Sequence, residues 1–214
     1  MAGNSPPQAP APEAPWYFRK RFTVFALIYG SSFPLGFLIA GLAGQPAQPA
    51  YKSSGHPLLF GSIALVGALG GYALRVWASS HLEASVVWQQ DVRLHELRVS
   101  GPYRYTRNPL YLGNLMQAVG IGLMGAWPVL LLLLIGMLIF TLALVSTEER
   151  FLSKTSGLAY AQYRSSVPRL IPLPWKIAPE GGPRGSPRDG FRSEIMTATF
   201  AAAVIVILLL TWPR

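Results

Sequence analysis

Long apolar runs separated by short polar segments dominate the pattern along this chain of 214 residues. Each run is close to the roughly 20 residues that an α-helix needs to cross the hydrocarbon core of a bilayer. The pattern therefore predicts an all-α fold, a polytopic membrane helical bundle with about five transmembrane helices. The predicted spans are residues 22–44, 58–79, 109–126, 129–145 and 195–212.

A short break separates the third and fourth predicted spans. Residues 125–128 read Gly-Ala-Trp-Pro, and a proline begins a helix well while the residue before it tends to end one. We therefore predict that helix 3 and helix 4 form a tight antiparallel hairpin, so that their far ends lie on the same side of the membrane. This topology brings the segment 101–113 (GPYRYTRNPLYLG) close to Glu148 and Glu149.

Polar side chains gather at these two far ends. The segment 101–113 contains two arginines and three tyrosines, and the glutamate pair ends the next apolar run. Converging charges at a membrane boundary are expensive unless they bind something, so the sequence predicts a membrane-embedded site for a polar ligand. Two simpler explanations stay open. The arginines and tyrosines would anchor the protein to lipid headgroups, or the glutamates would form structural ion pairs with Arg104, Arg107 or Arg150.

The start of the third span has a well-defined helix signal. Asn108 is suited to the N-cap and Pro109 to the first helical position. Tyr111, Asn114 and Gln117 follow on one broad face of this helix, where interhelical hydrogen bonds offer a simple explanation for polar groups.

Two further patterns lie outside that helix. Gly67 and Gly71 in the second span have the GxxxG spacing that permits close helix packing. Tyr160 and Tyr163 share one face of a predicted amphipathic helix on the inner leaflet, which residues 167–168 (Val-Pro) end.

Composition supports a membrane protein and limits its chemistry. Hydrophobic residues make up 51% of the chain and charged residues 13%, against about 25% charged residues in soluble domains. The absence of cysteine and the scatter of three histidines predict no metal site.

The charge pattern predicts an orientation. The net charge is +9, and all of the 18 lysines and arginines except Lys52 and Arg214 fall on one side if the N-terminus is inside. The positive-inside rule explains this bias better than nucleic acid does. We therefore expect a multi-pass integral membrane protein with its N-terminus and polar clusters in the cytoplasm and its C-terminus outside.

From residue 94 to residue 172, the sequence resembles the superfamily of isoprenylcysteine carboxyl methyltransferases and phospholipid methyltransferases. The resemblance consists of HELRVSGPYRYTRNPLYLG, the hairpin, EERFL and YAQYRSSVPRLIP, in this order. It implies a membrane-embedded methyltransferase that transfers a methyl group from S-adenosylmethionine to a lipid or other hydrophobic acceptor, at a carboxylate oxygen or an amine nitrogen. The implied partners are this acceptor and the bilayer, and no nucleic acid is expected.

Carried over by position, the resemblance also implies a set of cofactor-binding residues. They are His95, Leu97, Arg98, Tyr103, Arg107, Asn108, Pro109, Tyr111, Gly113, Glu148 and Glu149. No catalytic residue is assigned, because transfer from a sulfonium mainly requires positioning of the acceptor and exclusion of water.

The chain departs from the superfamily at two positions. Asn108 stands where many members have histidine, although an amide still offers a donor and an acceptor. Leu144 stands where the eukaryotic prenylcysteine enzymes have an arginine, which weakens the expectation of a prenylcysteine carboxylate acceptor.

The predicted organisation places the cofactor-binding methyltransferase core between two flanking membrane regions. The last span follows a polar Gly/Pro linker and resembles an appendage to a four-helix core. The predicted parts are a disordered tail (1–15), helices 1–2 with a cytoplasmic loop (16–93), the core (94–178), the linker (179–194) and the C-terminal transmembrane helix (195–214).

Two other functions remain possible from the sequence alone. An NADPH-dependent membrane reductase of the sterol type is one alternative, because sterol reductases resemble this superfamily around the same region. A non-catalytic membrane protein whose arginines bind anionic headgroups is the other.

Overall fold

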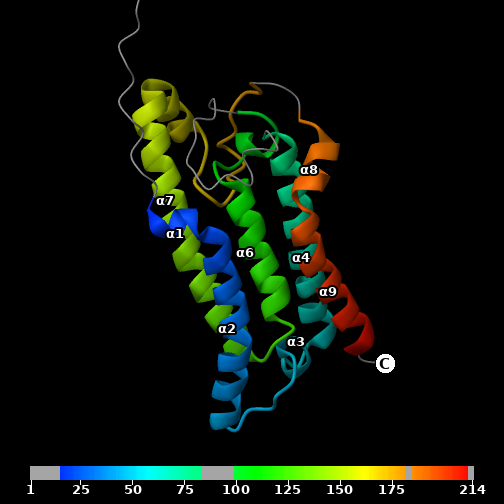
Figure 1. The fold of residues 1–214 in the computed structure, drawn as a ribbon. Helices are drawn as coiled ribbons and strands as arrows, with labels where there is room; N and C mark the ends of the chain where they lie inside the picture. Colours follow the sequence, from blue (N-terminus) through cyan, green and yellow to red (C-terminus); the bar gives the residue numbers. More distant parts are fainter. Residues whose placement is uncertain (1–14, 83–98, 182–184, 212–214) are drawn as a thin grey trace, which may run out of the picture.

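A computed structural model describes residues 15–82, 99–181 and 185–211, apart from a few side chains in the last helix. Over these residues the protein is a helical bundle without β-strands (Figure 1), so the predicted fold class is confirmed. The helices are α1 (Trp16–Arg19), α2 (Arg21–Leu42), α3 (Ala50–Ser53), α4 (Pro57–Ser80), the 3₁₀ helix η1 (Gly101–Arg104), α6 (Pro109–Gly122), α7 (Trp127–Ser166), α8 (Pro187–Ser193) and α9 (Ile195–Thr211).

The predicted number of five spans is not confirmed. Among the described residues, α2, α4 and α7 are each long and apolar enough to cross a membrane, and α8 with α9 makes a fourth span if this pair, bent by 74°, is taken as one. Helix α6 contains 14 residues, which gives about 21 Å at 1.5 Å per residue. It ends at Gly122, whereas the sequence predicted a span to residue 126.

The hairpin between α6 and α7 is confirmed. Four residues join the two helices, and Pro128 lies in the first turn of α7 as predicted. The Val129 amide donates to the Ala126 carbonyl at 2.8 Å, and the two helices run side by side (Figure 1).

Helix α7 continues well beyond its predicted end. It runs to Ser166, with its only break in helical geometry at Gly157, where φ is +46°. Glu148 and Glu149 therefore lie inside a helix, and the prediction that they close it is wrong. The apolar pattern ends near residue 145, but the next glycine or proline is Gly157, so nothing in the backbone stops the helix earlier.

Close packing of α4 on α6 is built on glycines from both helices. A Cβ atom on Gly71 would lie 2.6 Å from the Gly113 carbonyl oxygen, and one on Gly67 would lie 2.8 Å from the Met116 carbonyl oxygen. From the other side, a Cβ atom on Gly120 would lie 2.7 Å from the Ala64 carbonyl oxygen. The predicted close approach at the GxxxG positions is therefore confirmed, and α6 is the partner helix.

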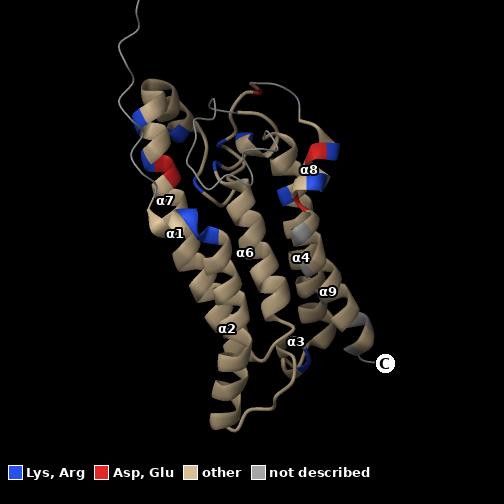
Figure 2. Cartoon of the chain, viewed as in Figure 1, with Lys and Arg blue, Asp and Glu red and all other residues tan. Residues whose placement is uncertain are grey.

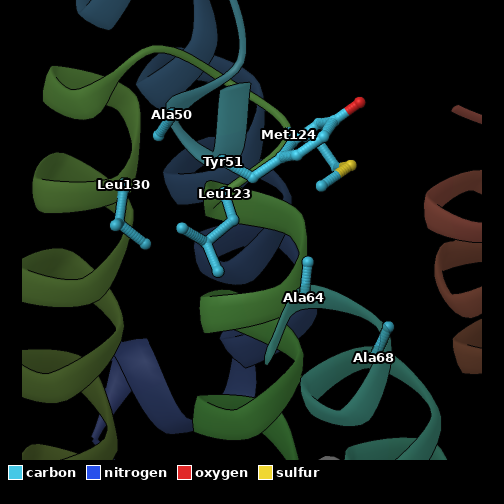
Figure 3. Packing of buried hydrophobic residues seen from close by; sticks show 7 residues of the cluster. All are labelled: Ala50, Tyr51, Ala64, Ala68, Leu123, Met124 and Leu130. Carbon is cyan, nitrogen blue, oxygen red and sulfur yellow. The ribbon is translucent and has the colours of Figure 1, made fainter. Parts of the chain in front are cut away.

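The two ends of the bundle differ in chemistry. Around α3, apolar side chains close the bundle (Figure 3); Tyr51 and Ala50 are fully buried, and the Ala50 amide donates to the Gly125 carbonyl at 2.6 Å. At the opposite end lie most of the described charged residues (Figure 2), whereas Lys52 belongs to α3. Charged residues are therefore unequally distributed between the two ends of the bundle, and the expected orientation rests on this inequality.

The C-terminal region packs against the bundle more closely than the sequence suggested. Helix α8 forms inside the segment expected to be a linker, and α8 and α9 both contact α4 (Figure 1). The Ser186 amide donates to the Ser80 carbonyl at 2.8 Å, and the Gln117 amide group donates to the Thr197 carbonyl at 3.5 Å. The interpretation of the last span as an appendage is therefore wrong.

We expect Gly71→Ala to lower the free energy of unfolding by about 1–3 kcal/mol, because the new methyl group must displace backbone rather than a flexible side chain. Thermal unfolding of the detergent-solubilised protein measures the effect. Gly30→Ala is the matched control, since nothing lies within 4 Å of its added Cβ atom. Equal melting temperatures for the two variants would show that the α4–α6 contact is looser than the structure has it.

Candidate functional site

The head of α6 and the middle of α7 meet through a tyrosine and a carboxylate. The Tyr111 hydroxyl donates to Glu148 Oε1 at 2.8 Å. The Tyr111 ring lies in an apolar cluster with Phe18, Phe140 and Leu144, so this carboxylate has an apolar floor. The predicted convergence of the two polar segments is confirmed by this contact.

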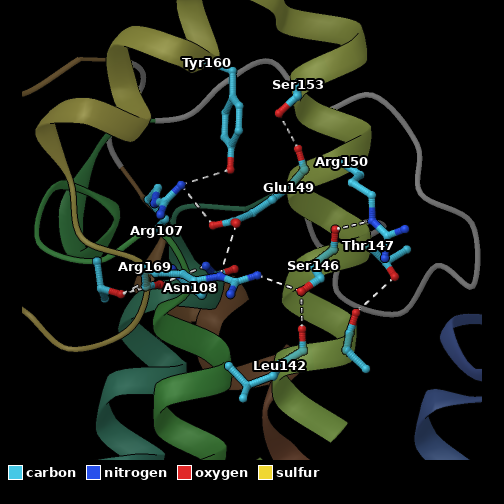
Figure 4. Close-up of polar contacts among 12 residues, drawn as sticks. Arg107, Asn108, Leu142, Ser146, Thr147, Glu149, Arg150, Ser153, Tyr160 and Arg169 are labelled. Atoms are coloured by element: carbon cyan, nitrogen blue, oxygen red, sulfur yellow. Dashed lines mark hydrogen bonds and ion pairs between the residues drawn. The ribbon is translucent and has the colours of Figure 1, made fainter. Parts of the chain in front are cut away.

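Glu149 follows Glu148 on α7 and has a different electrostatic setting (Figure 4). Arg107 Nη1 lies 3.0 Å from Glu149 Oε1, and Arg169 Nε lies 3.2 Å from Glu149 Oε2. Both oxygens of Glu149 therefore face a guanidinium group, as a structural ion pair requires. Glu148, in contrast, takes part in none of the ion pairs among the described residues.

Arg107 has an unused donor in this setting. Its Nη1 also donates to the Tyr160 hydroxyl at 3.5 Å (Figure 4). Its Nε is buried and has no hydrogen-bond partner among the described residues. A buried guanidinium N–H normally finds an acceptor, so this atom is a natural point of attachment for an anionic or carbonyl group of a ligand.

The loop after α7 covers the head of α6. The Asn108 side chain donates through Nδ2 to the Arg169 carbonyl at 2.9 Å, and the Arg107 amide donates to the Pro168 carbonyl at 3.0 Å. Arg169 Nη2 in turn donates to Ser146 Oγ at 2.7 Å. Asn108 occupies the predicted N-cap position, but its side chain makes no capping bond, because it binds this loop instead.

The part of α7 after the break at Gly157 folds back towards η1. Tyr160 and Tyr163 are buried, and the Tyr163 hydroxyl donates to the Tyr103 carbonyl at 2.7 Å. Burial, followed by the nearby Glu148 carboxylate, raises the pKa of the Tyr103 phenol well above its ordinary value. Tyr103 is therefore a neutral hydrogen-bonding group at any physiological pH.

Most of the residues expected in the site lie together. They lie on η1, on the connection from η1 to α6, at the head of α6 and on the facing stretch of α7: Tyr103, Arg107, Asn108, Pro109, Tyr111, Glu148 and Glu149. Gly113 instead faces α4, where an added Cβ atom would lie 2.6 Å from Arg75 Cγ. His95, Leu97 and Arg98 lie outside the described residues.

Two expected ion-pair partners of the glutamates bind elsewhere. Arg104 donates through Nε to the Ala178 carbonyl at 2.9 Å and lies 3.6 Å from Glu180. Arg150 donates to the Ser146 carbonyl of its own helix. Only Arg107, of the three arginines named from the sequence, reaches the glutamate pair.

Sequence reasoning missed Arg169 and the N-terminal residues near the site. The Tyr17 hydroxyl lies 2.9 Å from Thr147 Oγ1, and Arg21, at the start of α2, contributes a positive charge that acts on Glu148. The available signal was the run of aromatic and basic residues at 16–22 (WYFRKRF) directly before the first span. By itself this run supports only the orientation of the chain.

Comparison with known proteins supports the resemblance drawn from the motifs. The family model described as phospholipid methyltransferase matches residues 54–158. The Protein-S-isoprenylcysteine O-methyltransferase of Schizosaccharomyces pombe is 38% identical over 80 residues, which cover 37% of this chain. The chain thus spans about a third (34%) of the length of this curated relative. No solved structure matches the chain significantly.

We expect Glu149→Gln to loosen the loop after α7, because Arg107 and Arg169 lose their shared anionic partner. Leaving such a group unsatisfied costs about 1–3 kcal/mol. Limited trypsin digestion with mass spectrometry measures the effect as faster cleavage after Arg169. Glu180→Gln is the control, because Glu180 is 67% exposed in its pair with Arg104. Unchanged cleavage at Arg169 would mean that the ion pair does not hold the loop.

Proposed function

We propose that this chain, whose residues 54–158 match the phospholipid methyltransferase family, is a membrane-embedded methyltransferase that uses S-adenosylmethionine and acts on a lipid or other hydrophobic acceptor. One observation carries the proposal. At the charged end of the α6–α7 hairpin, the Glu148 carboxylate stands on an apolar floor, and the neighbouring Glu149 pairs with Arg107, whose buried Nε lacks a partner among the described residues. This combination suits a ligand that offers both hydrogen-bond donors and an anionic group.

The residues present fit the chemistry of S-adenosylmethionine. Its ammonium group and ribose hydroxyls are donors, which a carboxylate accepts, and its own carboxylate suits a guanidinium. Glu148 and Arg107 offer these two functions, and Tyr103, Asn108, Pro109, Tyr111 and Glu149 complete the proposed site. His95, Leu97 and Arg98 belong to the proposed site by resemblance alone.

The bound cofactor would supply a methyl group on a sulfonium, from which a nucleophile displaces it in line. The chain's part is then to orient the acceptor and exclude water. The apolar cluster of Phe18, Phe140, Leu144 and Val145 beneath Tyr111 serves to exclude water. A carboxylate acceptor needs no base, whereas an amine acceptor must lose a proton.

Glu148 is the better proton acceptor of the two glutamates. Both oxygens of Glu149 face guanidinium groups and are therefore already engaged in ion pairs. Glu148 accepts one hydrogen bond from Tyr111 and forms no ion pair among the described residues. For an amine acceptor, we assign the proton to Glu148.

We also propose that the charged end of the bundle faces the cytoplasm. The arginines and lysines around η1, α7 and α8 lie at this end (Figure 2), whereas Lys52 belongs to α3 at the opposite end. The positive-inside rule then places the site at the cytoplasmic boundary, where a lipid acceptor arrives sideways from the bilayer. The core (94–178) would bind the cofactor from that side.

Calorimetric titration of the purified protein in detergent with S-adenosylhomocysteine tests the function directly. We expect binding of S-adenosylhomocysteine and none of NADPH, run in parallel. Binding of NADPH alone would place the chain among the reductases. Binding of neither ligand to a folded protein would favour a non-catalytic lipid-binding membrane protein.

We expect Glu148→Gln to weaken binding of S-adenosylhomocysteine about tenfold or more while the melting temperature stays close to that of the parent. The neutral amide keeps an acceptor for Tyr111 but loses the charge that strengthens a hydrogen bond to a ligand. Glu180→Gln, which removes an exposed carboxylate, is the control. Unchanged affinity for S-adenosylhomocysteine in Glu148→Gln would remove this carboxylate from the proposed site.

A further inference from the structure

A buried ion pair joins α4 to the segment between α8 and α9. Arg75 Nε lies 2.7 Å from Glu194 Oε2, and Arg75 Nη2 donates to Glu194 Oε1 at 3.0 Å. The side chains are 12% and 1% exposed, respectively. Neither residue belongs to the proposed cofactor site, and the sequence had indicated no role for Glu194.

The carboxylate is fully hydrogen-bonded. Besides the two bonds from Arg75, it accepts one from Ser79 Oγ at 2.6 Å and one from Thr197 Oγ1. A buried charge pair is tolerated when the remaining lone pairs and protons are also satisfied, and these bonds meet that condition. Glu194 thus ties α4 to the first turn of α9.

The other face of the Arg75 guanidinium holds the head of α6. Its Nη1 donates to Asn114 Oδ1 at 2.6 Å and to the Leu110 carbonyl at 3.3 Å. The aliphatic part of Arg75 lies across Gly113, where an added Cβ atom would be 2.6 Å from Cγ. The Gly71 carbonyl oxygen would lie 2.8 Å from the same Cβ atom, so both the arginine stem and the α4 backbone favour glycine at this position, which the resemblance assigned to cofactor binding.

These contacts bracket Tyr111 on both sides along α6. Leu110 precedes it, and Gly113 and Asn114 follow on the face towards α4, while Tyr111 itself points to Glu148 of α7. The rotation of α6 about its axis decides where the Tyr111 hydroxyl lies. Because Arg75 fixes α6 from the α4 side and Glu194 fixes Arg75, the C-terminal helices help to set this rotation.

We propose that Arg75 and Glu194 are positioning residues for the site: with α8 and α9 they form a clamp that holds the head of α6 in the rotation that directs Tyr111 to Glu148. A test that measures the affinity for S-adenosylhomocysteine rests on the proposed function, whereas the clamp itself is a property of the fold. The C-terminal helices are then part of the functional unit, although they lie outside residues 54–158, which match the family.

Arg75→Lys separates positioning from a purely structural ion pair. A lysine retains the charge that Glu194 needs, but its compact ammonium group cannot also reproduce the forked bonds to Leu110 and Asn114. We expect this variant to keep a melting temperature close to that of the parent and to bind S-adenosylhomocysteine about tenfold or more weakly, since a small misplacement of binding groups has large effects. Amide hydrogen exchange should be faster in α6 residues 109–117 and unchanged in the hairpin turn.

Glu194→Gln and Glu180→Gln complete the experiment. We expect Glu194→Gln, which leaves Arg75 buried without an anionic partner, to lower the melting temperature and the affinity together. Glu180→Gln, at an exposed carboxylate, should change neither.

Two results distinguish failure of the clamp from failure of the function. Parental affinity and parental exchange at 109–117 in Arg75→Lys would overturn the clamp and leave a structural ion pair. If the parent binds no S-adenosylhomocysteine, the proposed function fails, and the exchange data alone decide the clamp: faster exchange at 109–117 supports it, and unchanged exchange overturns it.

Discussion

The close contact between α4 and α6 is the constraint on which the rest of the structure depends. Glycines at 67, 71, 113 and 120 bring the two backbones together, so that side chains of α4 reach the head of α6. In a lipid environment, such close packing replaces the hydrophobic effect as a source of helix association. The same approach places Arg75 across Gly113, and through Arg75 it connects α6 to the C-terminal helices.

At the polar end of the bundle, charged residues form two separate ion-pair networks. Glu149, with Arg107 and Arg169, ties α7 to the head of α6 and to the loop that follows α7. Arg75 and Glu194 do the same on the far side of α6. Glu148 keeps a single hydrogen bond from Tyr111. Glu148 is thus a carboxylate without an ion pair among the described residues, set between two ion-pair networks, and this contrast gives the site its chemical character.

The N-terminal and C-terminal helices both extend the core that the family match covers. Phe18 contributes to the apolar floor under Tyr111, and the Tyr17 hydroxyl meets Thr147 beside the glutamate pair. On the opposite side, α8 and α9 pack on α4. The site is therefore supported by segments from the whole described chain, and the hairpin alone would not hold it.

The sequence by itself determined the helical membrane character of the fold, the hairpin and the convergence of its polar ends, but not the number of spans. These follow from run length, from a proline after a short break and from antiparallel geometry, all of which are local or topological. Only the tertiary structure decided that Arg169 pairs with Glu149, that Asn108 binds a loop, and that Arg75 joins Glu194. Such pairings join residues 20 to 119 positions apart, and no local pattern specifies them, because each depends on how the helices rotate and pack.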